Sequence, residues 1–237
     1  MEIKTLVYFD LEATGLKSSG RPRISEISLV AVKSRDVQDF HSGIVNHLAA
    51  NKAGKKIESI LPRVIDKLTL CVYPMATVPP IVSEITGLDN YNLDGQARFD
   101  KNTGLLLNSF LARLPPPVCL VAHNGNLYDF PLLKAEMEHS GAELGYQLLC
   151  ADSYVGIREL FKKKEGLSTP SSFSLINLHK HLLGCPPEQS HGAEADCLAL
   201  LRVTAVLGEE FLNWVNANYY KFRHCCAMWK MSNQLTL

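Results

Sequence analysis

The amino-acid sequence predicts an α/β fold in which a mixed central sheet is flanked by helices. The first third of the chain contains three apolar, β-branched runs in succession, which favours antiparallel neighbours. Helical and strand-like patterns then alternate, and the last third has mainly helical spacing. This order is typical of a sheet whose strands run in both directions, with helices packed on its faces.

Strands are expected where short runs of apolar, β-branched and aromatic residues are bounded by polar residues, Gly or Pro. The third run stops at Pro74, which has no backbone N–H to extend a ladder. The predicted strands are residues 5–11, 24–33, 64–73, 118–122 and 147–151.

Helices are expected where apolar residues recur at spacings of three and four, and most of these segments end near a Gly. Residues 34–60 are polar and have no strong period, so we expect them to form a loop. The predicted helices are residues 80–87, 103–114, 129–139, 153–164, 173–183, 193–207 and 209–220.

Composition limits the class of protein. The chain has 237 residues, of which 46% are hydrophobic, and this fits one domain with a sizeable core. Its formal net charge is zero. Proteins that coat long duplexes usually carry a large basic excess, so neutrality argues against that role, although not against an enzyme that holds a few nucleotides at an end. No apolar run approaches the ~18 residues of a membrane span.

The cysteines indicate a reducing compartment. Seven cysteines without a C-x-x-C pair argue against both a disulfide framework and a structural zinc site. We therefore expect a soluble intracellular protein of the cytosol or the nucleus. His224-Cys225-Cys226 has no fourth ligand nearby in the sequence, so a plain tail is favoured there over a metal site.

Two acids occupy the end of the first predicted strand. Side chains alternate along a strand, so Asp10 and Glu12 project from the same face. Two adjacent carboxylates repel each other unless a cation lies between them, and hard divalent cations prefer oxygen ligands. A D-x-E pattern alone is more often a solvated strand end, so further acids are needed before it indicates a metal site.

A polar turn after residues 118–122 supplies a third acid. The segment from His123 leads into a helix that begins near Asp129, although aspartate at that position is equally suited to cap the helix. Tyr128 is expected to be exposed beside it, and its ring or hydroxyl would suit a nucleotide.

A histidine and a fourth acid occur together in His191-Gly192-Ala193-Glu194-Ala195-Asp196. On one helix, His191 and Asp196 would lie about 140° apart, so they serve one site only if His191 lies on the preceding loop. Gly192 permits this. A loop histidine exchanges protons near neutral pH, although most surface histidines have no such role.

Taken together, these segments resemble a known family. FDLEATG, VAHNGNLYDFPLL and HGAEAD are similar to the three motifs of the DnaQ-like exonucleases, in the branch with a histidine in the third motif. LPRVIDKLTLCVYP and SEITGL, at residues 61–74 and 83–88, further resemble the mammalian three-prime repair exonucleases. The resemblance covers about residues 5–215. It implies a ribonuclease H-like fold and a 3′–5′ exodeoxyribonuclease that releases mononucleotides, faster from single-stranded than from double-stranded DNA.

The resemblance also implies a role for each matching position. Asp10, Glu12, Asp129 and Asp196 match acids that hold metal, and two Mg²⁺ ions are expected there, with Mn²⁺ as a substitute. His191 matches the general base. The positions that match substrate contacts are Glu12, Ala13, Leu16, Ile85, Tyr128, Ser172, Ser174 and His191.

The same resemblance implies one exonuclease domain at residues 1–219 and a tail of undefined role at 220–237. The family forms homodimers through the strand that matches residues 64–73, so a homodimer is expected. Lys162–Lys164 match a segment that guides DNA, although a basic helix end that complements the helix dipole explains them equally well. The proline-rich segment and the membrane anchor of the mammalian cytosolic member have no counterpart in this sequence.

Three alternatives remain open from the sequence. The first is a related exonuclease that prefers RNA, because the sequence does not identify the contacts to the sugar. The second is a catalytically silent nucleic-acid-binding module, which is disfavoured because every catalytic position holds a suitable residue type. The third is a scaffold whose acids only solvate loops, and such a protein would bind neither Mg²⁺ nor Mn²⁺.

Overall fold

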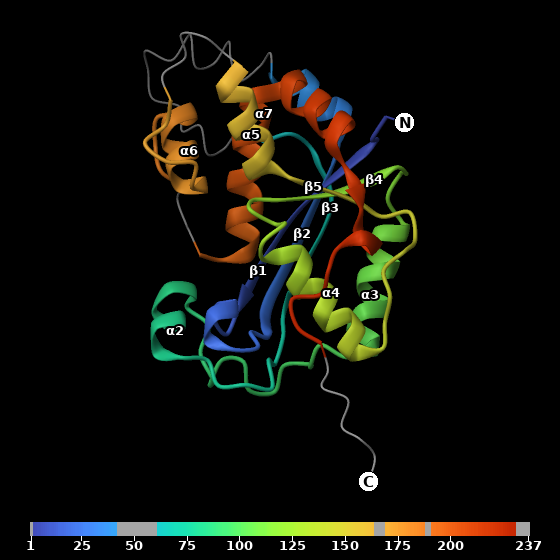
Figure 1. Ribbon diagram of the computed structural model, residues 1–237, viewed down its shortest axis with the longest axis vertical. Coiled ribbons are helices and arrows are strands. Elements are labelled where there is room, and N and C mark those ends of the chain that lie inside the picture. The colour runs from blue at the N-terminus through green and yellow to red at the C-terminus, as the bar shows by residue number, and fades with distance from the viewer. Residues whose placement is uncertain (1, 42–60, 164–168, 188–190, 231–237) are drawn as a thin grey trace.

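The computed structural model describes residues 2–41, 61–163, 169–187 and 191–230. Within these ranges the strands form one sheet in the order β3-β2-β1-β4-β5-β6 (Figure 1). The β1–β2, β2–β3 and β5–β6 pairs are antiparallel, and the β1–β4 and β4–β5 pairs are parallel. The predicted mixed sheet is confirmed. Its strands are β1 (Thr5–Ala13), β2 (Ile24–Lys33), β3 (Val64–Cys71), β4 (Val118–Ala122), β5 (Leu149–Asp152) and β6 (Tyr220–Lys221).

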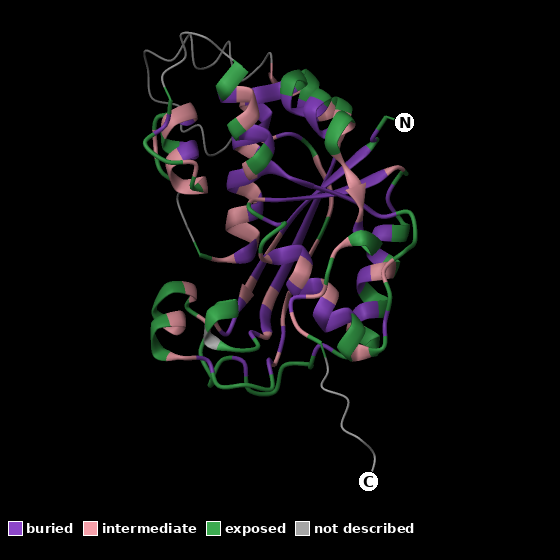
Figure 2. Cartoon of the chain, in the orientation of Figure 1, coloured by how far each residue is buried: buried purple, intermediate pink, exposed green. Residues whose placement is uncertain are grey.

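Helices cover both faces of the sheet, as Figure 1 shows. Alternation along β1 divides the core into two clusters: Val7 and Phe9 pack with α3 and α4, whereas Leu6 and Tyr8 pack with α5, α6 and α7. In Figure 2 the strands at the centre of the sheet are buried along most of their length. The helices are α2 (Pro80–Thr86), α3 (Lys101–Ala112), α4 (Asp129–Ser140), α5 (Ser153–Lys163), α6 (Leu175–Leu183) and α7 (Ala193–Asn218), with short 3-10 turns at Lys17–Ser19 and Phe222–His224.

Helix α7 is anchored to the sheet by a buried hydrogen bond. The Tyr8 hydroxyl and Thr204 Oγ1 lie 2.6 Å apart, deep in the core, and tie the middle of α7 to β1. The sequence predicts two helices here, at residues 193–207 and 209–220, and this is confirmed: α7 consists of two helical stretches separated by Gly208, whose φ of 53° and ψ of −127° are non-helical. A side chain at that position would collide with the His41 ring, so glycine allows both the kink and the close contact.

Part of the predicted loop at residues 34–60 differs from the sequence prediction. Residues 34–41 are helical rather than a loop, and buried Val37 packs with the cluster under α7. Tertiary packing therefore overrides a weak local pattern. The remainder of the predicted loop, residues 42–60, lies outside the described residues, as does Lys164.

Residues 220–230, the described part of the segment expected to be a tail, join the fold. β6 pairs with β5, Phe222 is buried, and the Met228 N–H donates to the Pro131 carbonyl at 2.8 Å. The Trp229 indole N–H donates to the Pro22 carbonyl at 3.1 Å. The sheet therefore extends beyond residue 219. The side chains of Phe222, Met228 and Trp229 pack in the core cluster on the face that carries α4.

None of the seven cysteines is part of a disulfide in the structure. Cys150 Sγ and Cys225 Sγ lie 3.8 Å apart. Among the described residues, potential metal ligands gather in one group, and His224, Cys225 and Cys226 do not belong to it. No helix in those ranges has the length and apolar character that a bilayer span requires.

Candidate active site

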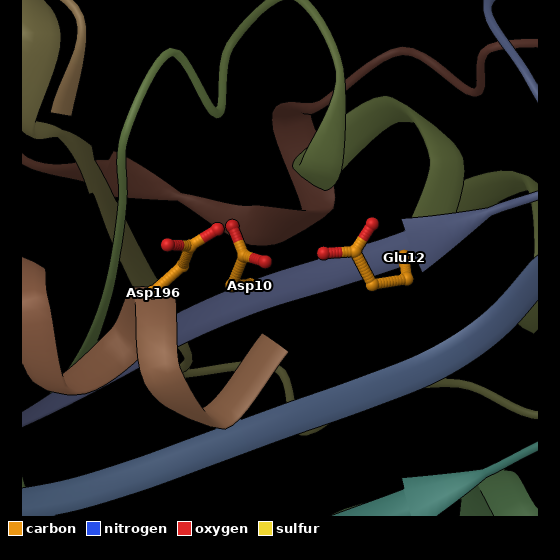
Figure 3. Close-up of side chains that lie close together, drawn as sticks. All are labelled: Asp10, Glu12 and Asp196. Carbon is orange, nitrogen blue, oxygen red and sulfur yellow. The ribbon is translucent and has the colours of Figure 1, made fainter. Parts of the chain in front are cut away.

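Three carboxylates converge at the C-terminal end of β1. Asp10 and Glu12 project from β1, and Asp196 projects from the first turn of α7 (Figure 3). One oxygen from each lies within 4.8 Å of the others. Alternation explains the geometry, because even-numbered residues of β1 face α7. The β1–β2 register shifts directly after Glu12, so regular pairing ends where the acids end.

The fourth predicted acid, Asp129, comes from α4, which packs in the core cluster opposite to that of α7. It opens α4, is buried, and lies outside the group of three defined by the 4.8 Å separation. Burial raises the pKa of Asp10 well above its usual value, and among the neighbouring charges Asp129 contributes most. Acids from β1, α4 and α7, far apart in the sequence, are therefore electrostatic neighbours.

The acids repel one another. Burial and neighbouring negative charges raise the pKa of Glu12 to about 8 and that of Asp129 to about 7. Burial also raises the pKa of Asp196. Among the described residues, no lysine or arginine forms an ion pair with any of the four. A set of converging oxygen donors that lacks a neutralising side chain fits a divalent metal cation.

These raised pKa values predict a pH-dependent stability. Between about pH 4, where such carboxyls titrate in an unfolded chain, and about pH 8, these four carboxyls hold more protons in the native protein than in the unfolded chain. The melting temperature in EDTA should therefore fall as the pH rises through this window. Added Mg²⁺ or Mn²⁺ should raise it, and the increase should be larger at about pH 8 than at about pH 5.5, because protons no longer compete for the carboxylates.

Thermal denaturation at the two pH values, with EDTA or with metal, measures this effect. Asp10→Asn removes one of the repelling charges, so the fall in EDTA should be smaller in that variant. A wild-type melting temperature that rises across the same window in EDTA would contradict the assignment of raised pKa values.

His191 lies beside the acids on a loop. Helix α7 begins at Ala193, so His191 precedes it, as the sequence argument requires if the histidine and Asp196 are to share a site. The His191 backbone has a left-handed φ of 68°, and its N–H donates to Asp196 Oδ2 at 3.3 Å. Its side chain is exposed. The carboxylate of Asp196 thus holds the backbone that carries the histidine.

A further carboxylate, not identified from the sequence, lies next to the cluster. Glu26 on β2 is the cross-strand partner of Glu12, and its Oε2 accepts the Ala193 backbone N–H at 2.8 Å. Its charge contributes to the raised pKa values of Asp10, Glu12 and Asp196. The available signal was an acid inside the mainly apolar strand ISEISLVAVK, where a charge needs a specific partner.

The predicted substrate-contact positions differ in their exposure. Leu16 and Ile85 are exposed apolar side chains, 65% and 48% accessible, whereas Ala13 is buried. Tyr128 was expected to be exposed, and this is wrong: it is half-buried, and its hydroxyl donates to the Gly15 carbonyl. That partner lies more than a hundred residues away in the chain, so the local pattern around Tyr128 did not reveal the contact.

Ser172 and Ser174 are exposed at the start of α6. Ser174 is the N-cap of this helix, and its oxygen accepts the Asn177 N–H at 3.4 Å. Ser172 Oγ donates to Ser174 Oγ at 3.2 Å. Lys162 and Lys163 are exposed at the end of α5.

The fold and the acid cluster define the class as a ribonuclease H-like, DnaQ-like α/β protein with a carboxylate site. Solved structures of exonuclease I share the fold: one has a TM-score of 0.68 at 14% identity over 90% of this chain. E. coli exonuclease I in complex with a dT13 oligonucleotide has a TM-score of 0.66 at 15% identity, also over 90% of this chain. The chain spans 43% of each of those proteins.

Sequence comparison gives the family. Three-prime repair exonuclease 1 of Bos taurus is 40% identical over 227 residues, which cover 93% of this chain and 69% of that protein. Three prime repair exonuclease 2 of Mus musculus is 36% identical over 231 residues, covering 95% and 93%. No protein-family model matches. The chain belongs to the three-prime repair exonuclease family.

Proposed function

We propose that the protein is a metal-dependent 3′–5′ exodeoxyribonuclease that releases mononucleotides from the 3′ ends of DNA. The convergence of Asp10, Glu12 and Asp196, with Asp129 as a charged neighbour, carries this proposal. Membership of the three-prime repair exonuclease family supports the direction and the substrate. The complex of E. coli exonuclease I with dT13 supports binding of single-stranded DNA by this fold.

The four acids would hold two Mg²⁺ ions, with Mn²⁺ as a substitute. Bound there, the cations would polarise the scissile phosphate and lower the pKa of a water molecule. The protein contributes the positions of the oxygens: β1 supplies two, and the first turns of α4 and α7 supply the others. Because these elements pack into the core, the ligand arrangement is built before metal binds.

His191 would accept the proton of the attacking water. Its exposed side chain and its place on a loop favour this role, since the ring is free to turn toward a substrate. The bond from its backbone N–H to Asp196 keeps it next to the acids. A base so placed needs to reach within about 3 Å of the proton it removes.

The terminal nucleotide would be held by side chains around the acids. Leu16 and Ile85 offer exposed apolar surface to a base, and half-buried Tyr128 would lie near the scissile phosphate. Ser172 and Ser174 would donate to the DNA backbone, and Glu12 and Ala13 would contact the terminal sugar and base. A single-stranded end reaches such a site without the energy cost of fraying a base pair, so it should be degraded faster.

Release of mononucleotides tests this function. Matched single-stranded DNA and RNA oligonucleotides, each labelled at the 5′ end, are incubated with protein and Mg²⁺. DNA should shorten one nucleotide at a time from the 3′ end, and EDTA should stop the reaction. Faster shortening of RNA would favour the RNA-preferring alternative, and the absence of metal-dependent shortening of either substrate would refute the nuclease assignment.

We also propose a homodimer through β3. In the described part of the sheet β3 is the first strand, and most of its residues are only partly buried. An edge strand offers unpaired backbone groups that a second copy could pair with. Light scattering at micromolar concentration should give the mass of two 26.3 kDa chains. A monomeric mass would contradict this proposal and leave the chemistry of the site unaffected.

A further inference from the structure

Asp152, the last residue of β5, is an acid whose contacts suggest a role beyond packing. Only 3% of its surface is accessible. Among the described residues it forms no ion pair with a lysine or arginine. Its carboxylate instead accepts three backbone N–H groups: Oδ1 accepts those of Asn124 at 3.0 Å and Tyr154 at 2.9 Å, and Oδ2 accepts that of Asn126 at 3.0 Å. These bonds offset the cost of burying the charge.

Two of the three bonds hold the turn between β4 and α4. Asn124 has a left-handed φ of 63°, which costs free energy in a residue other than glycine. Gly125 lies so close to the core that a Cβ atom would be 2.6 Å from that of Ala122. A turn with these constraints needs strong partners, and the Asp152 carboxylate bonds to the residues on both sides of Gly125.

The turn leads directly into the site. Leu127 donates its N–H to the Asn124 carbonyl at 3.1 Å, and Phe130 donates to the Gly125 carbonyl at 3.0 Å. Tyr128 and Asp129 lie between these two bonded residues. A shift of the turn would therefore move Asp129, at the start of α4, relative to Asp10 on β1.

We propose that Asp152 is a positioning residue for the nuclease reaction: it fixes the turn that presents Asp129, and thereby sets metal affinity and turnover. This inference rests on the proposed function. Asp152 does not bind the metal itself, since its oxygens are used by the three backbone N–H groups. Side chains that orient metal ligands typically contribute about 10–100-fold to metal affinity or activity.

A buried carboxylate elsewhere in the protein provides a matched control. Glu136 on α4 is also fully buried, and its Oε1 accepts from Arg23 Nε at 2.6 Å. It stabilises the fold, but its contacts do not include the β4–α4 turn. Asp152→Asn and Glu136→Gln both remove a charge with little change of shape, so both should lower the melting temperature. In Asp152→Asn, an NH₂ group replaces one of the two oxygens that accept backbone N–H groups. At least one backbone N–H therefore loses its acceptor and faces another donor.

The experiment compares the two variants below their melting temperatures. Mn²⁺ binding by calorimetry and kcat on a single-stranded DNA oligonucleotide should each fall about 10-fold or more in Asp152→Asn. The KM for the oligonucleotide should change much less. Glu136→Gln should stay within about twofold of wild type in Mn²⁺ binding and kcat. This substitution lowers the fraction of protein that is folded, but it does not change the site in the folded protein.

Wild-type Mn²⁺ affinity and kcat in folded Asp152→Asn would overturn the inference and leave Asp152 a structural residue. Should that variant not fold, Asp152→Glu keeps the charge but moves the oxygens by one methylene, and the same loss of Mn²⁺ affinity and kcat is expected. An inactive wild-type protein would instead refute the proposed function, and Mn²⁺ binding would still show whether Asp152 positions the ligands.

Discussion

Asp196→Asn should abolish nucleotide release while the protein stays folded. The variant keeps the shape of the side chain and loses the charge that faces Asp10 and Glu12. Because residues of one catalytic unit act together, loss of one removes most of the rate enhancement, and we expect a decrease of about 10³-fold or more. The melting temperature in EDTA should rise slightly, since a repelling charge has been removed.

Glu194→Gln is the control for this experiment. Glu194 lies two residues away on the same turn of α7, but its carboxylate bonds to Lys67 at 2.6 Å and to Thr69 at 3.0 Å, away from the cluster. This partly exposed ion pair should contribute about 1 kcal/mol or less, and activity should stay within about twofold of wild type. An active Asp196→Asn protein, or equal losses in both variants, would refute the assignment of Asp196 as a metal ligand.

His191→Ala should lower kcat without loss of metal binding. The side chain is exposed, so its removal leaves the fold intact, and the acids remain in place. A general base typically contributes about 10²–10⁴-fold, and we expect a decrease of that size on single-stranded DNA. Calorimetry should give the wild-type affinity for Mn²⁺.

His224→Ala provides the comparison, since it removes another exposed histidine, one on the 3-10 turn at Phe222–His224. Its activity should equal that of wild type. If His191→Ala retained nearly full activity, His191 would not be the base. A loss of Mn²⁺ binding in His191→Ala would instead mean that the histidine supports the metal site itself.

The main elements of the fold were predictable because, along most of the chain, the local hydrophobic pattern matches the helix or strand that forms there. The strand at 24–33 has the predicted bounds, and the acids at 10 and 12 share a face, as period-two alternation requires. The helix at 34–41 and β6 were not predicted. The first depends on Val37 packing beneath α7, and the second has only two residues, too few to show a period.

Some residues of the candidate site could likewise be predicted from the sequence, and others could not. Acids that end a strand or begin a helix stand out in a sequence because a charge follows or precedes an apolar run. Glu26 and Asp152 were not identified because their partners are backbone N–H groups of residues 193, 124, 126 and 154, which the sequence does not reveal. For Glu26, the one available signal was its charge inside a strand. The exposure of Tyr128 was misjudged because Gly15, its partner, belongs to another loop.

The central place of β1 makes the enzyme unusually sensitive to length changes at one point. β1 pairs with β2 on one side and with β4 on the other, and its odd- and even-numbered residues serve opposite layers. One residue added or removed between Thr5 and Asp10 would reverse the faces of the residues that follow. Asp10 and Glu12 would then point into the apolar core beneath α4, and Leu11 would point toward Asp196. The spacing of the nine residues from Thr5 to Ala13 is therefore fixed by the two layers that they serve.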